Sequence, residues 1–394
     1  MSRPSLTRRQ LLMRAGAFGA AGLSLPALLG AGAISATSGK ASPRTRPASR
    51  RPASGGGELY VENWPSYIDP SEDDLVGTAD RFMEATGIDL TYTEAYNDNN
   101  EYFALIQPVL GRGETIDPDI IVPTGWMAGR LINLGWVDEL PLEEIPNAAN
   151  LRDDLVNPPW DPNGTFSLPW QTGFTGIAYN IDVTERELTS VDDLFDPAFE
   201  GKIGMLTEMR DTIGLILLSQ GVDVSAISSF DEAAEAFTKL EQAKSDGQIR
   251  AFTGNDYLGD LESGNFAACV GWSGDVAQLT VDNPSIRFII PESGGISWAD
   301  TMVIPKGAEN RTEAAAWMDF VYDPVQAAQL TAWVQYVSPV KGVQEEVAKI
   351  DPDLAENPLI FPTEETLAQV HGFANLDEDT EAEFDEAFAS IVGA

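Results

Sequence analysis

The chain has 394 residues, 43% of them hydrophobic, which is enough for about two or three domains with a sizeable core. Nine of its 24 basic residues lie within residues 1–57, which contain no acidic residue, so the other 337 residues carry 15 basic and 62 acidic side chains. Such a negative field repels nucleic acids and anionic membranes and attracts cations. One cysteine, Cys269, and one histidine, His371, exclude an internal disulfide and a Cys/His zinc site. We expect no metal and no cofactor.

The basic N-terminal region is typical of an export signal. Arg8 and Arg9 precede an apolar stretch over residues 15–33, and small residues follow it, as signal peptidases require. The pattern looks like a twin-arginine signal, which we predict over residues 1–36, with a flexible Ser/Pro/Arg/Gly linker over 37–57. We therefore expect a periplasmic or extracellular, cell-surface associated protein. A signal retained as a membrane anchor is the alternative.

From residue 58 onward, predicted strands alternate with predicted helices. Strands are expected at 59–61, 88–92, 119–122, 203–206, 266–270, 286–290 and 302–304, and helices at 70–85, 230–244 and 313–322. Ser229 and Glu232 predict a capping box at the start of the second of these helices. The alternation predicts an α/β fold with mostly parallel sheets, in which ligands bind beyond the carboxyl ends of strands.

Aromatic and acidic residues gather directly after these strands. They are Trp64 and Tyr67, then Trp126 after Thr124, then Glu208 and Asp211, then Trp272, then Trp298 and Asp300. Aromatic faces attract ammonium groups, and a carboxylate adds a charge-assisted hydrogen bond. The pattern therefore predicts a cleft for an elongated apolar cation. The remaining tryptophans at 136, 160, 317 and 333 are predicted to pack in the core, whereas Trp170 could serve either role.

Several segments resemble the spermidine/putrescine-binding proteins of ABC importers. They are residues 59–70, 122–126, 169–177, 270–274, 294–301 and 336–339. The resemblance implies a two-lobe type II periplasmic-binding-protein fold with the ligand cleft between the lobes. Two or more hinge crossings are implied, two of them near 169–172 and 294–298. The predicted first lobe comprises 58–169 and 299–338, and the second 170–298 and 339–394.

The same resemblance implies a role for each site residue. The aromatic rings that would line the ligand are those of Trp64, Tyr67, Trp272 and Trp298. Asp300 would bind one amine of the ligand with Tyr336 nearby, and Glu208 and Asp211 would bind the far amine. Thr124 would supply the hydroxyl that the family often has from a serine, and Trp126 would narrow one end of the cleft. Arg210 is a candidate neutralising partner for this acidic pair. A glutamine that the family carries late in the chain has only Asn375 as a counterpart here.

The predicted function is therefore that of an exported, monomeric binding protein. It would capture spermidine or putrescine and deliver it to an ABC permease, without catalysis. One alternative keeps the fold but changes the ligand to an agmatine-like cation or a sugar. A second is a serine hydrolase with Ser273 as nucleophile, in a sequence close to G-x-S-x-G, and with His371 as base. The abundance of acidic residues is also the composition of a protein adapted to high salt.

Overall fold

The computed structural model describes residues 56–72 and 75–393, so the predicted signal and most of the predicted linker lie outside the described residues. The chain divides into two units, residues 1–54 and 55–394, and all the elements below belong to the second. Its first strand starts at Gly56, so the last two residues of the predicted linker belong to this strand. Among the described helices, none is both long and apolar enough to span a membrane.

One group of elements is built on parallel strands near the start of the sequence. The strands are β1 (Gly56–Asn63), β2 (Ile88–Glu94) and β3 (Ile120–Ile121), and the helices are α2 (Thr78–Thr86), α3 (Asn99–Leu110), α4 (Gly125–Asn133) and α10 (Arg311–Val321). Along β1, Leu59, Val61 and Asn63 are buried at every second position, as expected for one face of a strand that packs against a core. We call this group the first lobe.

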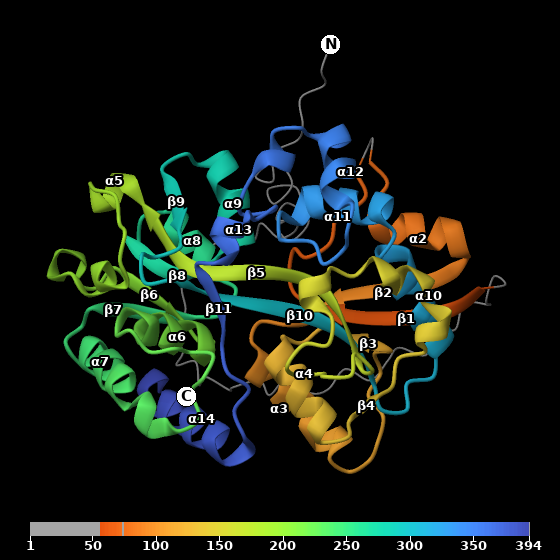
Figure 1. Cartoon of the computed structure of the whole chain (residues 1–394), viewed down its shortest axis with the longest axis horizontal. Coiled ribbons are helices and arrows are strands. Elements are labelled where there is room, and N and C mark those ends of the chain that lie inside the picture. Colours follow the sequence, from red (N-terminus) through yellow and green to blue (C-terminus); the bar gives the residue numbers. More distant parts are fainter. Residues whose placement is uncertain (1–55, 73–74, 394) are drawn as a thin grey trace, which may run out of the picture. The chain divides into compact units, whose positions relative to one another are not determined.

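A second group is built on three further parallel strands. The strands are β6 (Ile203–Leu206), β7 (Ile249–Thr253) and β8 (Ala268–Trp272), and the helices are α6 (Met209–Ser219), α7 (Ala234–Ser245), α8 (Tyr257–Glu262), α9 (Ser273–Asp282) and α14 (Glu378–Val392). The two strand groups occupy opposite sides of Figure 1. We call this group the second lobe.

Two long strands join the lobes into one sheet. β5 (Ser167–Asn180), buried along its whole length, pairs antiparallel with β10 (Gly295–Pro305), and the strand order is β2-β1-β3-β10-β5-β8-β6-β7. Short strands complete the sheet: β4 (Val137–Asp138) and β11 (Val370–Gly372) pair with β10, and β9 (Ile286–Ile289) pairs with β5. Both long strands run between the lobes in Figure 1 and contain segments predicted as crossings.

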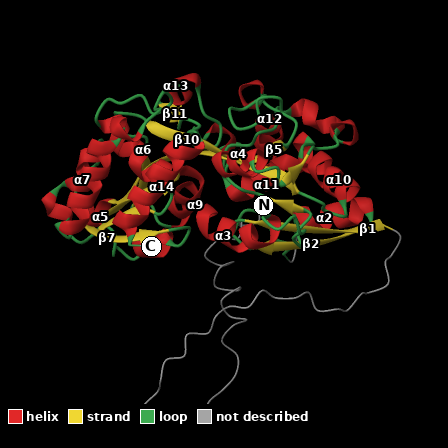
Figure 2. Ribbon diagram, turned by 90° about the horizontal axis from the view of Figure 1, so that it is seen from below, coloured by secondary structure: helices red, strands yellow, loops and turns green. Residues whose placement is uncertain are grey.

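The prediction of mostly parallel sheets is wrong, because the sheet is mixed. β5 and β10 are antiparallel to each other, β10 is antiparallel to β3, and β5 is antiparallel to β8. The physical reason is that the chain passes between the lobes in opposite directions, so its two passes meet antiparallel. Helices lie on both faces of the sheet (Figure 2). All seven predicted strands are found, most with ends shifted by a few residues, and the one predicted at 302–304 is the end of the longer β10.

One predicted helix start and one predicted helix cap are wrong. The first helix starts at Thr78 instead of residue 70, because the carboxylate of Asp69 accepts a hydrogen bond from the Thr78 amide (3.0 Å) and stops the helix from extending further back. The second begins as a 3-10 turn at Phe230, and its capping box does not form. Glu232 instead accepts hydrogen bonds from the Ser229 hydroxyl (3.0 Å) and from a neighbouring serine.

The remaining helices follow β5 or lie near the C-terminus. They are α5 (Ile181–Thr184), α11 (Pro324–Val334), α12 (Val343–Ile350) and α13 (Glu364–Leu367), with 3-10 turns at Leu142–Glu144, Pro146–Asn150, Asp153–Leu155, Val191–Phe195, Pro197–Phe199 and Leu354–Glu356. α12 packs against α11, whereas α14 packs against α6 and α7. The exact lobe boundaries stay a prediction.

Candidate ligand-binding site

A cavity of about 470 Å³ is lined by residues from both lobes and from the two long strands. All ten residues predicted for the site lie in its wall: Trp64, Tyr67, Thr124, Trp126, Glu208, Asp211, Trp272, Trp298, Asp300 and Tyr336. The structure thus brings together residues up to 272 positions apart in the sequence. Their role in binding a ligand stays a prediction.

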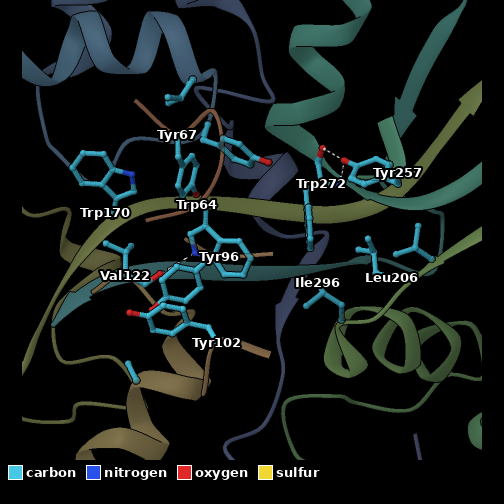
Figure 3. Packing of buried hydrophobic residues seen from close by; sticks show 14 of the residues in the cluster. Trp64, Tyr67, Tyr96, Tyr102, Val122, Trp170, Leu206, Tyr257, Trp272 and Ile296 are labelled. Atoms are coloured by element: carbon cyan, nitrogen blue, oxygen red, sulfur yellow. Dashed lines mark hydrogen bonds between the residues drawn. The ribbon is translucent and has the colours of Figure 1, made fainter. Parts of the chain in front are cut away.

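Trp64 is held rigidly on the first-lobe side. Its indole N–H donates to the Val122 carbonyl (2.8 Å), and its ring lies 4.8 Å from the ring of Tyr96. Tyr96 in turn stacks on Tyr102 at 3.9 Å. Figure 3 shows these three rings as one pile, with Trp272 and Tyr257 apart from them. Because the indole is fixed at both its edge and its face, Trp64 presents a preformed wall to the cavity.

Tyr336 connects the other aromatic residues of the wall. Its ring packs against Tyr67 at 5.2 Å, edge to face, and against Trp298 at 5.5 Å. It fits only because residue 274 is a glycine: a Cβ there would lie 2.5 Å from the Tyr336 ring. A Cβ at residue 173 would similarly lie 2.6 Å from Trp298. Two glycines therefore make room for the rings.

Asp300 is buried at the centre of the site, with only 6% of its surface exposed. One carboxylate oxygen accepts from the Tyr67 hydroxyl (2.9 Å) and the other from the Thr124 hydroxyl (2.7 Å). Burial nevertheless dominates and raises the pKa of Asp300 to about 7, with the nearby Asp211 and Asp275 adding to the rise. The carboxyl is thus held in place, and no lysine or arginine among the described residues forms an ion pair with it.

Asp211 fixes two tryptophans at once. One carboxylate oxygen accepts from the Trp272 indole (3.0 Å) and the other from the Thr175 hydroxyl (2.7 Å). Thr175 in turn accepts from the Trp298 indole (3.0 Å). Burial raises the pKa of Asp211 to about 6, although these hydrogen bonds and the charge of Arg210 favour ionisation.

Glu208 stands where the two lobes meet. Its Oε1 accepts from the side-chain amide of Asn99 (2.7 Å), which also donates to Thr124 (2.9 Å). Burial, with the charges of Asp98 and Asp211, raises the pKa of Glu208 to about 8. This site residue therefore already contacts the N-terminus of α3 across the cleft.

Arg210 does not form an ion pair with the acidic residues beside it in the sequence, contrary to expectation. Its guanidinium forms an ion pair with Glu381 of α14 and lies 4.0 Å from the ring centre of Trp126. Arg130 lies over the same ring at 5.1 Å. Trp126 thus lines the cavity while its ring also contacts two protein cations.

The structure adds residues that the sequence analysis did not assign to the site. Among them are Asp275, Phe174 and Asn255, together with Trp160, which was predicted to pack in the core. Asp275 could have been found as a carboxylate three residues after Trp272. The other three carry no sequence signal. Asn375, the only counterpart of the family's late glutamine, also lines the cavity.

Trp170 is a core residue, since it is buried and stacks on Trp317 at 5.9 Å. Ser273 is poorly placed for the alternative hydrolase function. It is fully buried, and its Oγ accepts a hydrogen bond from the Phe174 amide (3.1 Å). In the described part of the chain, no hydrogen bond joins Ser273 to His371, which lies on β11.

Comparisons with known proteins agree with this geometry. The family model of bacterial extracellular solute-binding proteins matches residues 77–363. The spermidine/putrescine-binding periplasmic protein of Escherichia coli is 24% identical over 310 residues, covering 78% of this chain and 84% of the relative. A putrescine/agmatine-binding protein of Pseudomonas aeruginosa is 26% identical over 332 residues, covering 79% and 85%.

Among solved structures, the spermidine/putrescine ABC transporter substrate-binding protein of Streptococcus pneumoniae superposes with a TM-score of 0.69 at 25% identity, covering 85% of this chain and 98% of that one. The predicted two-lobe, type II periplasmic-binding-protein fold is thereby confirmed, and the curated relatives are binding proteins. Since the family model covers more than half of the sequence, the chain belongs to the family of bacterial extracellular solute-binding proteins.

Proposed function

We propose that this protein binds a polyamine, spermidine or putrescine, in the aromatic and acidic cavity between its lobes. The observation that carries the proposal is the set of buried carboxyl groups of Asp300, Glu208 and Asp211. In the described part of the chain, none of the three forms an ion pair with a lysine or arginine. A buried carboxylate without a cation is unfavourable, so the ligand is the natural source of the positive charge.

The aromatic wall supports the same ligand class. Trp64, Trp272, Trp298 and Tyr336 come from both sides of the cavity and present ring faces and edges rather than hydrogen-bonding groups. The indole N–H groups of all three tryptophans are already bonded within the protein. The rings therefore suit methylene chains and ammonium groups, whereas the carboxyl groups suit the charged ends.

The alternative ligands fit this site less well. A neutral sugar would leave the buried carboxyl groups uncompensated, and the indole N–H groups of Trp64, Trp272 and Trp298 already donate to protein acceptors. An agmatine-like cation satisfies the same charges, and one relative carries agmatine in its name. We therefore retain agmatine as the second candidate.

We further propose how the protein works in the cell. It would be exported by a twin-arginine-type signal, act as a monomer without catalytic activity, and deliver its ligand to an ABC permease. The lobes would comprise residues 58–169 with 299–338, and 170–298 with 339–394, and would close on the ligand. The names of the polyamine-binding relatives support this role.

The proposal is tested by the melting temperature of residues 56–394 with putrescine, spermidine, spermine, agmatine and several sugars, at low and high salt. A ligand specific for the folded state adds about 2.7 kcal/mol of stability at a hundred times its Kd. We expect a shift of several degrees with one polyamine that survives 1 M salt. A shift that salt abolishes would mean that amines only coat the acidic surface, and a shift with a sugar alone would refute the polyamine.

A further inference from the structure

A group of charged residues connects the two lobes beside the cavity. Arg130 on α4 of the first lobe donates to Asp385 (2.7 Å) and to Glu381 (3.1 Å), both on α14 of the second lobe. Neither Arg130 nor the two acids line the cavity. The ion pairs therefore join the lobes through protein groups alone.

Arg210 of α6 extends this connection toward the cavity. It forms an ion pair with Glu381, so one carboxylate is shared by guanidinium groups from opposite lobes. The same two guanidiniums lie 5.1 Å (Arg130) and 4.0 Å (Arg210) from the ring centre of Trp126. The indole on α4 is thus a second contact between the lobes, because it binds Arg210 by a cation–π interaction.

We propose that Trp126, Arg130, Arg210, Glu381 and Asp385 form a latch that holds the lobes closed. Trp126 is then a closure residue rather than a wall that stacks on the ligand. The inference rests on the proposed function for the identity of the ligand, since it names the groups that set how long that ligand stays bound. All the contacts of the latch are made between protein side chains, so it can form before a ligand binds.

Charge balance explains why the latch favours closure. Within it, the first lobe contributes one cation, Arg130, and the second lobe contributes one cation and two carboxylates. Opening would leave Arg130 without either of its acids and the second lobe with an unbalanced negative charge. The side chains are only partly exposed, at 18% for Arg130, 15% for Glu381 and 8% for Arg210, so salt screens them less than surface pairs.

A second polar contact crosses the cleft, but it includes a site residue. Thr207 donates to Asp98 (2.8 Å), and Asn99 donates to Glu208 (2.7 Å). Removing these groups would alter both closure and the cavity. The latch can be tested separately, because Arg130, Glu381 and Asp385 lie outside the cavity wall.

The test uses Arg130→Met, with Arg112→Met as its matched control. Arg112 also forms an ion pair, with Glu114 at 2.8 Å, but both residues are exposed and belong to the same lobe. Spin labels at Glu84→Cys and Glu241→Cys report the distance between the lobes. The native Cys269 does not interfere, because it is buried in the core and burial raises the pKa of its thiol well above the usual range.

Without ligand, we expect part of the wild-type protein and part of the Arg112→Met variant to show a short distance between the two spin labels, as in the closed form. We expect Arg130→Met to lose this short-distance population. We expect Asp385→Asn, which removes only one ion pair, to lose part of the short-distance population. This milder variant replaces Arg130→Met in the test if Arg130→Met does not fold. Identical distance distributions for the wild type and the Arg130 and Asp385 variants would overturn the latch. This readout needs no ligand, so a failure of the polyamine proposal would leave the test intact.

Ligand release and Trp126→Leu complete the test. We expect spermidine or putrescine, whichever binds, to dissociate about tenfold faster from Arg130→Met than from Arg112→Met, because a less stable closed state shortens the residence time. Trp126→Leu should also shift the ligand-free distance toward the open form. If Trp126→Leu weakens binding while the ligand-free distance stays unchanged, Trp126 is a ligand wall and its assignment to the latch is wrong.

Discussion

The hydroxyl of Tyr67 donates a hydrogen bond of 2.9 Å to the carboxylate of Asp300, although the two residues are 233 positions apart in the sequence. Tyr67 follows the first strand of the first lobe, and Asp300 lies on β10, one of the two long strands that join the lobes. The bond orients the carboxyl group toward the cavity but does not neutralise it. The proposed ligand would complete the charge balance.

Asp300→Asn should weaken polyamine binding at least tenfold, which is ~1.4 kcal/mol or more, because the amide cannot neutralise an ammonium group. Calorimetric titration measures the loss. Glu84→Gln is the control, since it removes one negative charge from an exposed position outside the cavity. Equal losses in both variants would show that only the overall field of the protein attracts the ligand.

Trp298→Ala should also weaken binding while the protein still unfolds cooperatively, because the ring lines the cavity and is only partly buried. Titration combined with thermal unfolding measures both quantities. A loss of cooperative unfolding would make Trp298 a core residue instead.

Thr175→Val tests the hydrogen-bond chain that orients the tryptophans. The substitution keeps the shape of the side chain but leaves Asp211 without one donor and the Trp298 indole without its acceptor. We expect affinity to fall severalfold and the tryptophan fluorescence to change. Thr331→Val is the matched control, because that threonine is equally buried but its hydroxyl has no partner within the described residues. Unchanged affinity in Thr175→Val would show that the chain does not position the rings.

Gly274→Ala should weaken binding more than tenfold, since the added Cβ would lie 2.5 Å from the Tyr336 ring and displace it. Gly259→Ala, in a helix with no atom within 4 Å of the added Cβ, should leave affinity unchanged. Titration of both folded variants makes the comparison. Wild-type affinity in Gly274→Ala would show that the position of Tyr336 is not important for binding.

Binding should strengthen as the pH rises from 5 to 8. Burial raises the pKa values of Asp211, Asp300 and Glu208 to about 6, 7 and 8, so the free site holds protons that a cationic ligand must displace. Without ligand, the folded state binds more protons than the unfolded chain, so these groups lower stability as pH rises from about 4 to 8. Titration in buffers of different ionisation enthalpy should therefore show proton release.

The pH dependence of the ligand-induced shift in melting temperature provides the contrary outcome. A ligand-induced shift in melting temperature that is the same at pH 5 and pH 8 would mean that the three carboxyl groups are already ionised in the free protein. The shift should instead grow across this range, because the ligand restores the stability that ionisation of the buried groups removes.

The sequence by itself predicted seven strands of the sheet and ten residues that line the cavity, but it did not predict β5, the longest strand in the described part of the chain. Buried strands such as β3 and β6 are continuous apolar runs, and a residue that follows such a strand lies at the edge of the sheet whatever the rest of the fold. This local rule, together with the resemblance to polyamine-binding proteins, was enough to place Trp64, Glu208 and Asp300 around one cavity.

Only the tertiary structure decided which groups contact one another. Arg210 lies between Glu208 and Asp211 in the sequence, yet it pairs with Glu381, because the turn of α6 directs its side chain toward α14. Trp126 likewise contacts the guanidinium of Arg210 on α6, which no local pattern relates to α4, whereas its other guanidinium neighbour, Arg130, lies one turn away on the same helix. Such pairings depend on how separate elements pack, and the free energy of a buried charge depends on all its neighbours, so neither can be read from the order of residues.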